Sequence, residues 1–279
     1  MSMSTPALAM PAPTAGATLR DLLRLMGRPS PDGPLTGDNL AFTLWRVRRG
    51  ASLLHEGAPA HSLYLLRSGS LKCLKTREDG YEQVLAFAQA GDLLGFEALH
   101  LGCQPMSALA LEDSSAYLLP LCELPELRRR CPLLDEALQH ALSRQLVRAG
   151  EVTEMMAAVV SEVRLVRFLL WQSARLEALR QSPRRFVLRM GRRDIASLLA
   201  LAPETLSRSF TSLVDQGCLK LSNREVELLD VERLRAQGRC TRSRRTVAPG
   251  PEPRLPQVAA AAGVRHRLTA GHLPHQAAA

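Results

Sequence analysis

The sequence contains no run of about 18 apolar residues, the length that a helix needs to cross a lipid bilayer. Its first twenty residues carry no charge ahead of their apolar stretch and are interrupted by proline, which argues against a secretory signal. We therefore expect a cytoplasmic chain with no membrane partner.

Common enzyme motifs are missing as well. The chain has no GxSxG, no HExxH and no phosphate-cradling GxxxxGK(S/T), and its seven histidines have no evident catalytic companions. We expect that the protein is not an enzyme.

The six cysteines form no CxxC pair and have no histidine at zinc-binding spacing, so we predict no metal site. Free thiols are the default state in a reducing cytoplasm. Reversible oxidation of a thiol pair such as Cys122 and Cys131 is an alternative, although buried, inert cysteine is the commoner state.

Positive charge is concentrated in one region of the 279-residue chain, which is long enough for two domains with cores of their own. Residues 161–245 hold 18 Lys and Arg against 9 Asp and Glu, whereas residues 1–160 hold 15 against 17. A localised basic excess favours a polyphosphate partner, and we expect double-stranded DNA.

The basic region contains a pattern typical of a helix-turn-helix. Apolar residues recur at helical spacing between residues 192 and 213, on both sides of a break at residues 201–203. Pro203 suits the first turn of the second helix, and Glu204 suits its positive end. Predicted strands at 187–190, 218–221 and 225–229 complete a winged helix-turn-helix. The helix pair alone would also fit any α-helical domain.

The outer face of the second helix carries side chains able to read DNA. Arginine can bond guanine O6 and N7 together, glutamate can accept from the cytosine amino group, and serine can donate to a base or phosphate. We predict base contacts from Glu204, Ser207 and Arg208. Phosphate contacts are predicted from four further residues: Arg192, Arg193, Thr205 and Arg224.

Residues 1–121 have a different sequence pattern. Between residues 40 and 121, short β-type runs alternate with glycine turns, which predicts a small antiparallel barrel or roll. Residues 1–38 form a leader that we expect to be mostly disordered, apart from a helical fragment at 19–26. Residues 239–279 are predicted to be a disordered basic tail.

Residues 133–160 predict one long helix, because proline is absent and apolar residues recur in steps of three and four from Leu134 through Leu138, Leu142 and Leu146. Such a helix would be roughly 40 Å long. Its apolar stripe needs a partner, either the chain's own roll or a second copy of the helix.

Several stretches resemble the CRP/FNR regulators, and the FNR branch is the nearest. They are GAPAHSLYLLRSGSLK (57–72), GYEQVLAFAQAGDLLGFEAL (80–99), SALALED (107–113), SEVRLVRFLL (161–170), MGRRDIASLL (190–199) and ETLSR (204–208).

The resemblance implies an α+β chain whose β-roll effector domain (39–132), of cyclic-nucleotide-binding type, precedes a dimerisation helix (133–160) and a winged helix-turn-helix (161–238). It also implies a homodimer on an inverted repeat of TTGAT-like half-sites, contact with RNA polymerase if the protein activates, and an unidentified signal. A winged helix used as a protein-interaction module is the alternative function.

The effector positions depart from those of the known relatives. Phe96 follows Gly95 where cyclic-nucleotide-binding relatives have glutamate, and Met106 precedes Ser107 where they have arginine, so cyclic AMP is not predicted. An iron–sulfur cluster is not predicted either. No cysteine precedes Cys73, and Tyr117 occupies the position in the roll where oxygen-sensing relatives have a cluster-binding cysteine. Haem is not excluded, with candidate ligands at His55, His61 and His100, and none is assigned.

Overall fold

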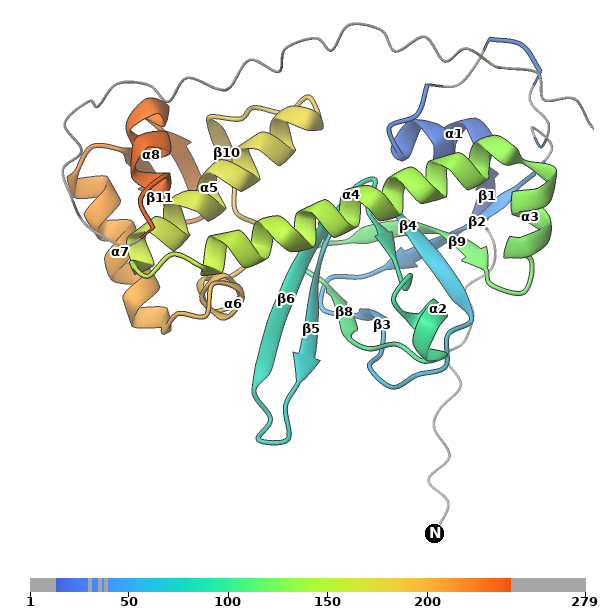
Figure 1. Cartoon of the computed structure of the whole chain (residues 1–279), viewed down its shortest axis with the longest axis horizontal. Helices are drawn as coiled ribbons and strands as arrows, with labels where there is room; N and C mark the ends of the chain where they lie inside the picture. The colour runs from blue at the N-terminus through green and yellow to red at the C-terminus, as the bar shows by residue number, and fades with distance from the viewer. Residues whose placement is uncertain (1–13, 30–31, 35–36, 38–39, 242–279) are drawn as a thin grey trace, which may run out of the picture. The chain divides into compact units, whose positions relative to one another are not determined.

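The structure, a computed structural model, describes residues 14–29, 32–34, 37 and 40–241. A β-rich N-terminal part is followed by the long helix α4 and a mainly helical C-terminal part (Figure 1). Within these residues, no helix has the length and apolar character required to cross a membrane.

The N-terminal part is a roll of two antiparallel sheets, as the sequence predicts. Fully buried apolar side chains such as Leu66, Leu71 and Ala116 pack between the sheets. One sheet has the order β1 (Thr14–Ala17), β2 (Phe42–Val47), β9 (Ser114–Pro120), β4 (Ser62–Ser68) and β7 (Leu93–Leu94). The other has the order β3 (Ser52–Leu54), β8 (Ser107–Ala110), β5 (Ser70–Thr76) and β6 (Glu82–Gln89).

The turn from β4 to β5 requires glycine. Gly69 has φ +89°, in the left-handed region, and a Cβ placed on it would lie 2.2 Å from Ser114 Oγ and 2.8 Å from Ser114 Cα. Neither the backbone angle nor the space admits a side chain, so the glycine here follows from the tight junction of two strands.

The leader is more ordered than the sequence predicts. Helix α1 (Leu19–Leu25) begins at a capping box, in which Thr18 and Asp21 each bond the other's backbone. Leu19, Leu22 and Met26 are buried in the same apolar cluster as the β1–β7 sheet and α4. The helical fragment predicted at 19–26 is thus present as α1, and its apolar face covers this sheet. Residues 14–18 depart from the predicted disorder, and residues 1–13 lie outside the described part.

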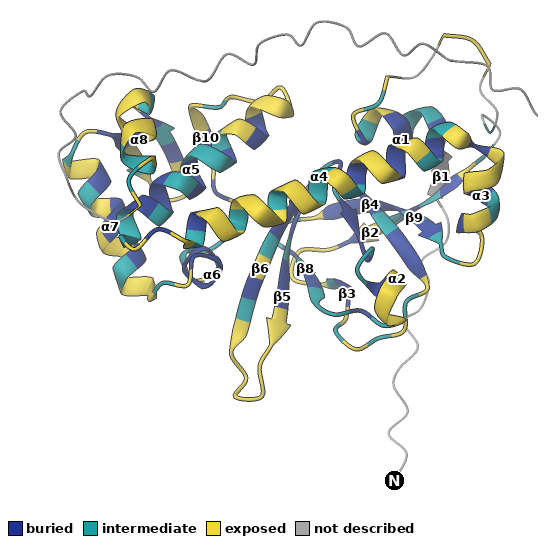
Figure 2. Ribbon diagram, in the orientation of Figure 1, coloured by how far each residue is buried: buried dark blue, intermediate teal, exposed yellow. Residues whose placement is uncertain are grey.

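Helix α4 (Pro132–Met156) follows the short helices α2 (Ala98–Leu101) and α3 (Leu124–Arg130). Its two halves have different surroundings. Leu134 and Leu138 are buried against the chain's own roll, whereas Leu146 and Val147 are 67% and 61% exposed. Figure 2 shows buried and exposed residues alternating along α4. The single apolar stripe that the sequence predicts is thus divided: its first half is already covered within one chain.

The C-terminal part is the predicted winged helix-turn-helix. It consists of α5 (Ser161–Ala178), β10 (Arg185–Val187), α6 (Arg192–Leu198), α7 (Pro203–Asp215), β11 (Leu219–Ser222), β12 (Glu225–Leu228) and α8 (Val231–Gly238). The strands form a sheet of order β10–β12–β11. Its apolar core also includes Val84 and Phe87 of β6, so the roll and this C-terminal part share one cluster. Residues 242–279 of the predicted tail lie outside the described part.

Candidate nucleic-acid interface and effector pocket

The corner between α6 and α7 is held by an arginine from α5. Ala200 has φ +50°, a left-handed conformation that costs a non-glycine residue roughly 1 kcal/mol. The Arg164 guanidinium donates to the carbonyls of Leu199 at 3.0 Å and Ala200 at 3.2 Å, and to Ala158 at 2.7 Å. A cation at the C-terminal end of α6 also suits the helix dipole. Arg164 therefore positions the corner that aims α7.

Helix α7 buries one face and exposes the other. Leu206, Phe210 and Leu213 are buried, at spacings of four and three residues, whereas Glu204 and Arg208 are exposed. Figure 2 shows both buried and exposed residues on α7. Among the described residues, neither Glu204 nor Arg208 has a side-chain hydrogen bond or ion pair. Both groups are thus available to an external partner.

The side chains of Ser207 and Thr205 on α7 are less available to a partner than the sequence suggests. Ser207 Oγ is exposed but donates to Pro203 O at 3.0 Å, so its lone pairs face outward and it offers an acceptor. The side chain of Thr205 is half-buried. In this conformation Ser207 suits a base amino group better than a phosphate.

The arginines predicted to contact phosphate fall into two kinds. Arg193 and Arg224 are exposed, and Arg224 lies at the β11–β12 turn, where Asn223 has φ +54°. Arg192 instead stacks on Phe210, with Cζ 3.5 Å from the ring centroid, and burial lowers the pKa of its guanidinium. Arg192 therefore belongs partly to the packing of α6 on α7.

Helix α6 contacts the roll through polar groups as well as apolar ones. Ser197 Oγ accepts from the Val84 backbone N–H at 2.9 Å and donates to Glu82 O at 3.0 Å. The Lys72 ammonium lies 3.0 Å from Asp194 Oδ1. Burial alone would lower the pKa of Lys72, but hydrogen bonds to Asp194 and Glu82 outweigh it and raise that pKa. The first helix of the motif is thus docked on β5 and β6.

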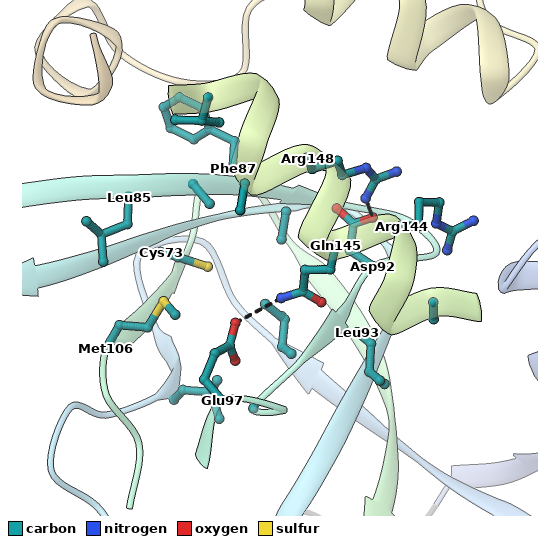
Figure 3. Close-up of a pocket in the computed structure, with 18 of the residues that line it drawn as sticks. Cys73, Leu85, Phe87, Asp92, Leu93, Glu97, Met106, Arg144, Gln145 and Arg148 are labelled. Atoms are coloured by element: carbon teal, nitrogen blue, oxygen red, sulfur yellow. Dashed lines mark hydrogen bonds and ion pairs between the residues drawn. The ribbon is translucent and has the colours of Figure 1, made fainter. Parts of the chain in front are cut away.

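A pocket of about 230 Å³, the roll pocket, lies where the roll meets α4 and α5 (Figure 3). Its walls are mainly apolar. Polar lining groups are few, and Figure 3 shows Glu97 and Gln145 pointing toward each other, with Gln145 Nε2 donating to Glu97 Oε1 at 2.9 Å. The apolar lining includes Leu54, Phe87, Leu93, Leu94, Met106 and Val152.

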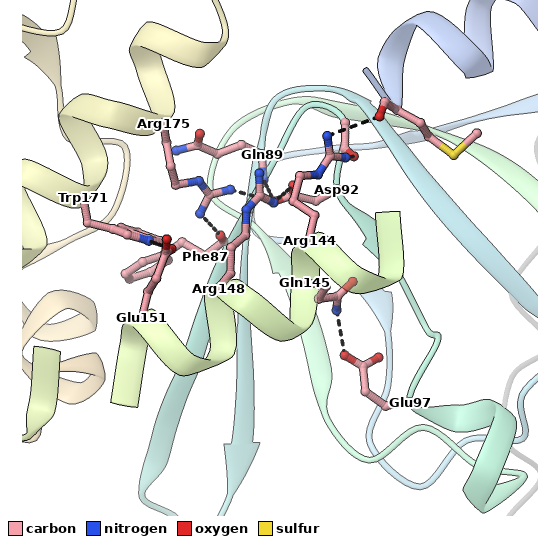
Figure 4. Close-up of polar contacts among 12 residues, drawn as sticks. Phe87, Gln89, Asp92, Glu97, Arg144, Gln145, Arg148, Glu151, Trp171 and Arg175 are labelled. Carbon is pink, nitrogen blue, oxygen red and sulfur yellow. Dashed lines mark hydrogen bonds and ion pairs between the residues drawn. The ribbon is translucent and has the colours of Figure 1, made fainter. Parts of the chain in front are cut away.

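One edge of the roll pocket is a polar network in which Asp92 joins three parts of the chain (Figure 4). Asp92 lies in the β6–β7 turn, and its carboxylate pairs with Arg148 of α4 and, at 2.7 Å, with Arg175 of α5. Arg175 also donates to Phe87 O at 2.9 Å. Arg144 of α4 donates to backbone carbonyls, at 2.9 Å in the case of Gly91. The roll, the long helix and the DNA-binding domain therefore meet at one carboxylate.

Comparisons with known proteins match both parts of the chain. The family model of the cyclic nucleotide-binding domain matches residues 44–131, and that of the Crp-like helix-turn-helix domain matches residues 163–237. The transcriptional regulatory protein btr of Bordetella pertussis is 34% identical over 198 residues, which cover 71% of this chain and 82% of that protein. The chain belongs to the CRP/FNR family.

Other members of the CRP/FNR family agree with this assignment. The fumarate and nitrate reduction regulatory protein of Salmonella typhi is 31% identical over 206 residues, covering 74% of this chain and 82% of its own. The structure of FixK2 from Bradyrhizobium japonicum is 26% identical with a TM-score of 0.54, covering 71% of this chain and 98% of that one. The two curated relatives are regulators rather than enzymes, and the fold that the sequence predicts is confirmed.

The family model implies a cyclic nucleotide in the roll pocket, but the residues present do not fit that group. Among the described residues lining it, the cations are Arg144, Arg148 and Arg175, and each already bonds a carbonyl or Asp92. The Glu97 carboxylate also lines the space. A cyclic phosphate would meet this carboxylate, and it would have to compete with Asp92 and backbone carbonyls for the lining guanidinium groups.

The positions weighed for metal cofactors are spread over the fold. Within the described part of the chain, no three His, Cys, Asp or Glu side chains gather as metal ligands. Tyr117 is buried, and burial raises its pKa. The candidate haem ligands His55, His61 and His100 are each exposed to solvent. Tyr117 has no thiolate to offer, so it does not fit an iron–sulfur cluster.

Sequence reasoning missed Arg164, which holds the corner between α6 and α7, and Ser197 and Arg175, which connect the C-terminal part to the roll. Their partners lie 35, 113 to 115, and 88 positions away in the chain, respectively. Local periodicity carries no information about such partners. The one available signal is Arg175 itself, an arginine at a position that helical spacing places on the buried side of α5.

Proposed function

We propose that this member of the CRP/FNR family regulates transcription by binding an inverted DNA repeat as a homodimer through α7. The observation that carries the proposal is that Glu204 and Arg208 are exposed, with no side-chain partner in the described part of the chain, on a helix whose opposite face is buried. A recognition helix must present base-reading groups near its N-terminal end, and both residues lie in the first two turns of α7.

Each base-reading residue has a distinct role in this proposal. Arg208 bonds O6 and N7 of a guanine, Glu204 accepts from a cytosine amino group, and Ser207 accepts from an amino group of a neighbouring base. The resemblance to the FNR branch implies TTGAT-like half-sites. Arg193, Arg224 and Thr205 contact phosphates and set the register, with Arg192 adding charge from its place over Phe210.

Dimerisation is proposed to occur through the predicted helix 133–160, on the uncovered side of α4. Four exposed residues on this side recur at positions i, i+3, i+4 and i+7, which is the spacing of a coiled-coil seam: Ser143, Leu146, Val147 and Gly150. Pairing of two such helices places two copies of α7 about one DNA turn apart, as a two-fold symmetric site requires.

The remaining assignments follow from this role. The effector domain spans 39–132 and the DNA-binding domain spans 161–238, and the protein acts in the cytoplasm, where bacterial DNA is found. An activator of this type would also contact RNA polymerase. The roll pocket is the proposed place of the signal, with neither a cyclic nucleotide nor an iron–sulfur cluster as the effector.

The direct test is selection of binding sites from random duplexes by the full chain, followed by footprinting on a selected duplex. We expect enrichment of an inverted repeat whose half-site centres are about one helical turn, roughly 34 Å, apart. The footprint should cover both halves. Retention of all duplexes without enrichment, or selection of a single half-site, would contradict the proposal.

A further inference from the structure

The roll pocket combines an apolar body with hydrogen-bond acceptors. Its volume of about 230 Å³ exceeds that of an engineered cavity of about 150 Å³ that binds benzene. Leu93, Phe87 and Met106 supply apolar surface around this space (Figure 3). A molecule with one ring and a short chain fits such a volume.

Two lining groups offer acceptors to such a molecule. Gln104 is 4% exposed, and its Oε1 has no hydrogen-bond partner among the residues that the structure describes. Glu97 contributes a carboxylate on the same pocket, fixed by Gln145 at 2.9 Å. An unpaired buried carbonyl oxygen is costly unless something donates to it, so a ligand that carries a donor satisfies this site.

Of the two carboxylates that line the pocket, Asp92 is paired with arginine and Glu97 has no ion pair among the described residues. The pKa of the Cys73 thiol is raised to about 12, first by burial and then by the charges of Glu97 and Asp92. Arg148 and Arg175 pair with Asp92, and Arg144 donates to the carbonyls of Met26 and Gly91. The charge that a ligand in this space would meet without a counter-ion at the carboxylate is therefore that of Glu97.

We propose that the roll pocket binds a small amine, an apolar body carrying a protonated amino group that donates to Glu97 and Gln104. This inference rests on the proposed function only in treating the pocket as the place of the signal. The ligand class differs from that of a cyclic nucleotide in sign of charge and in its lack of phosphate.

A ligand in the pocket affects the DNA-binding domain through its contacts with α5. Trp171 and Arg175, both on α5, line the pocket, and Arg175 lies 4.6 Å above the indole ring (Figure 4). Trp171 Nε1 donates to Glu151 of α4 at 2.7 Å. A ligand packed against this wall changes the environment of the indole and the freedom of α5 relative to the roll.

The test uses three probes with the same phenylbutyl body: 4-phenylbutylamine, 4-phenyl-1-butanol and 4-phenylbutyrate. Binding to the full chain is followed by calorimetry, and by fluorescence in a Trp45→Phe variant that leaves Trp171 as the remaining tryptophan. The amine is protonated at neutral pH and is expected to bind at least about tenfold more tightly than the carboxylate. The alcohol is expected to fall between them.

The Glu97→Gln variant removes the charge and keeps the shape. We expect it to abolish the preference for the amine over the alcohol, whereas Glu123→Gln, at an exposed position before α3, should keep that preference. If Glu97→Gln fails to fold by circular dichroism, the probe series on the unaltered chain still decides the question.

Four results would overturn the inference: no binding of the amine at millimolar concentration, equal binding of the carboxylate, tighter binding of cyclic AMP, or an unchanged preference in Glu97→Gln. DNA binding is measured separately on the unaltered chain without probes. A chain that binds the amine but selects no duplex refutes the proposed function alone, and the reverse result refutes this inference alone.

Discussion

The Asp92 carboxylate lies 2.7 Å from the Arg175 guanidinium, so a turn of the roll is tied directly to the first helix of the DNA-binding domain. Their side chains are 11% and 9% exposed, and Arg148 of α4 completes the contact. Because these groups are buried, the pair depends on all three elements being in place together. A shift of α5 relative to the roll must break it.

Replacing Asp92 with asparagine should destabilise the protein by about 3 kcal/mol, because a buried guanidinium loses its counter-charge. Urea unfolding measures this change, and hydrogen exchange should become faster in α5 and α6. Glu126→Gln is the matched control, since Glu126 pairs with Arg129 and Arg130 on the surface of α3, where ion pairs contribute little. Equal losses in the two variants would show that burial of the Asp92 pair is unimportant.

Replacing Arg208 with alanine should weaken binding to the selected duplex by about 1–3 kcal/mol and relax the preference at one G·C pair. The reason is that the Arg208 guanidinium donates two hydrogen bonds, to O6 and N7 of one guanine, and alanine donates none. Fluorescence anisotropy with every base at that pair measures the effect. Arg235→Ala on α8 removes the same charge from another helix and should preserve the preference; retained discrimination in Arg208→Ala would remove Arg208 from base reading.

Arg192 and Arg193 are neighbours that should behave differently. Alanine at the exposed Arg193 should lower the slope of log affinity against log salt by about 0.9 without changing stability. Alanine at Arg192 should also reduce the free energy of unfolding by roughly 1 kcal/mol, because the stacking on Phe210 is lost. Salt titrations and urea unfolding of both variants check this, and an unchanged stability of Arg192→Ala would count against the stacked role.

Replacing Leu146 with glutamate should convert the proposed dimer to monomer, because a charge would be buried at the centre of the seam on α4. Light scattering after size exclusion gives the mass, and affinity for a two-half-site duplex should fall toward that for one half-site. Leu99→Glu on α2 alters a leucine that is 45% exposed and should leave the mass unchanged. A dimeric Leu146→Glu variant would place the interface elsewhere.

Cys73 should resist thiol reagents in the folded protein. Its pKa is raised from 9.0 to about 12, by burial first, so stability from the neutral thiol is complete below pH 9 and is lost as the pH rises toward 12. At slightly alkaline pH the exposed Cys122 should react and Cys73 should react only in urea. Peptide mapping after labelling separates the two, and rapid native labelling of Cys73 would mean that the roll pocket is open.

The local elements were largely predictable. The roll predicted between residues 40 and 121 and the helix pair around Pro203 are both confirmed, because alternation and helical spacing are properties of neighbouring residues. The strand Phe42–Val47 was not predicted, and the leader helix was predicted without its partner. Its place on the sheet depends on residues far along the chain.

The sequence by itself determined the winged helix-turn-helix, the roll and the outer face of α7, since charge, turn residues and periodicity specify them locally. Only the tertiary structure decided which half of α4 is covered, that Arg192 stacks on Phe210, and that Asp92 joins Arg148 to Arg175. It also decided that Glu97 and the buried Gln104 line the roll pocket. These features arise from side chains that folding brings together from distant segments, so no local pattern could have shown them.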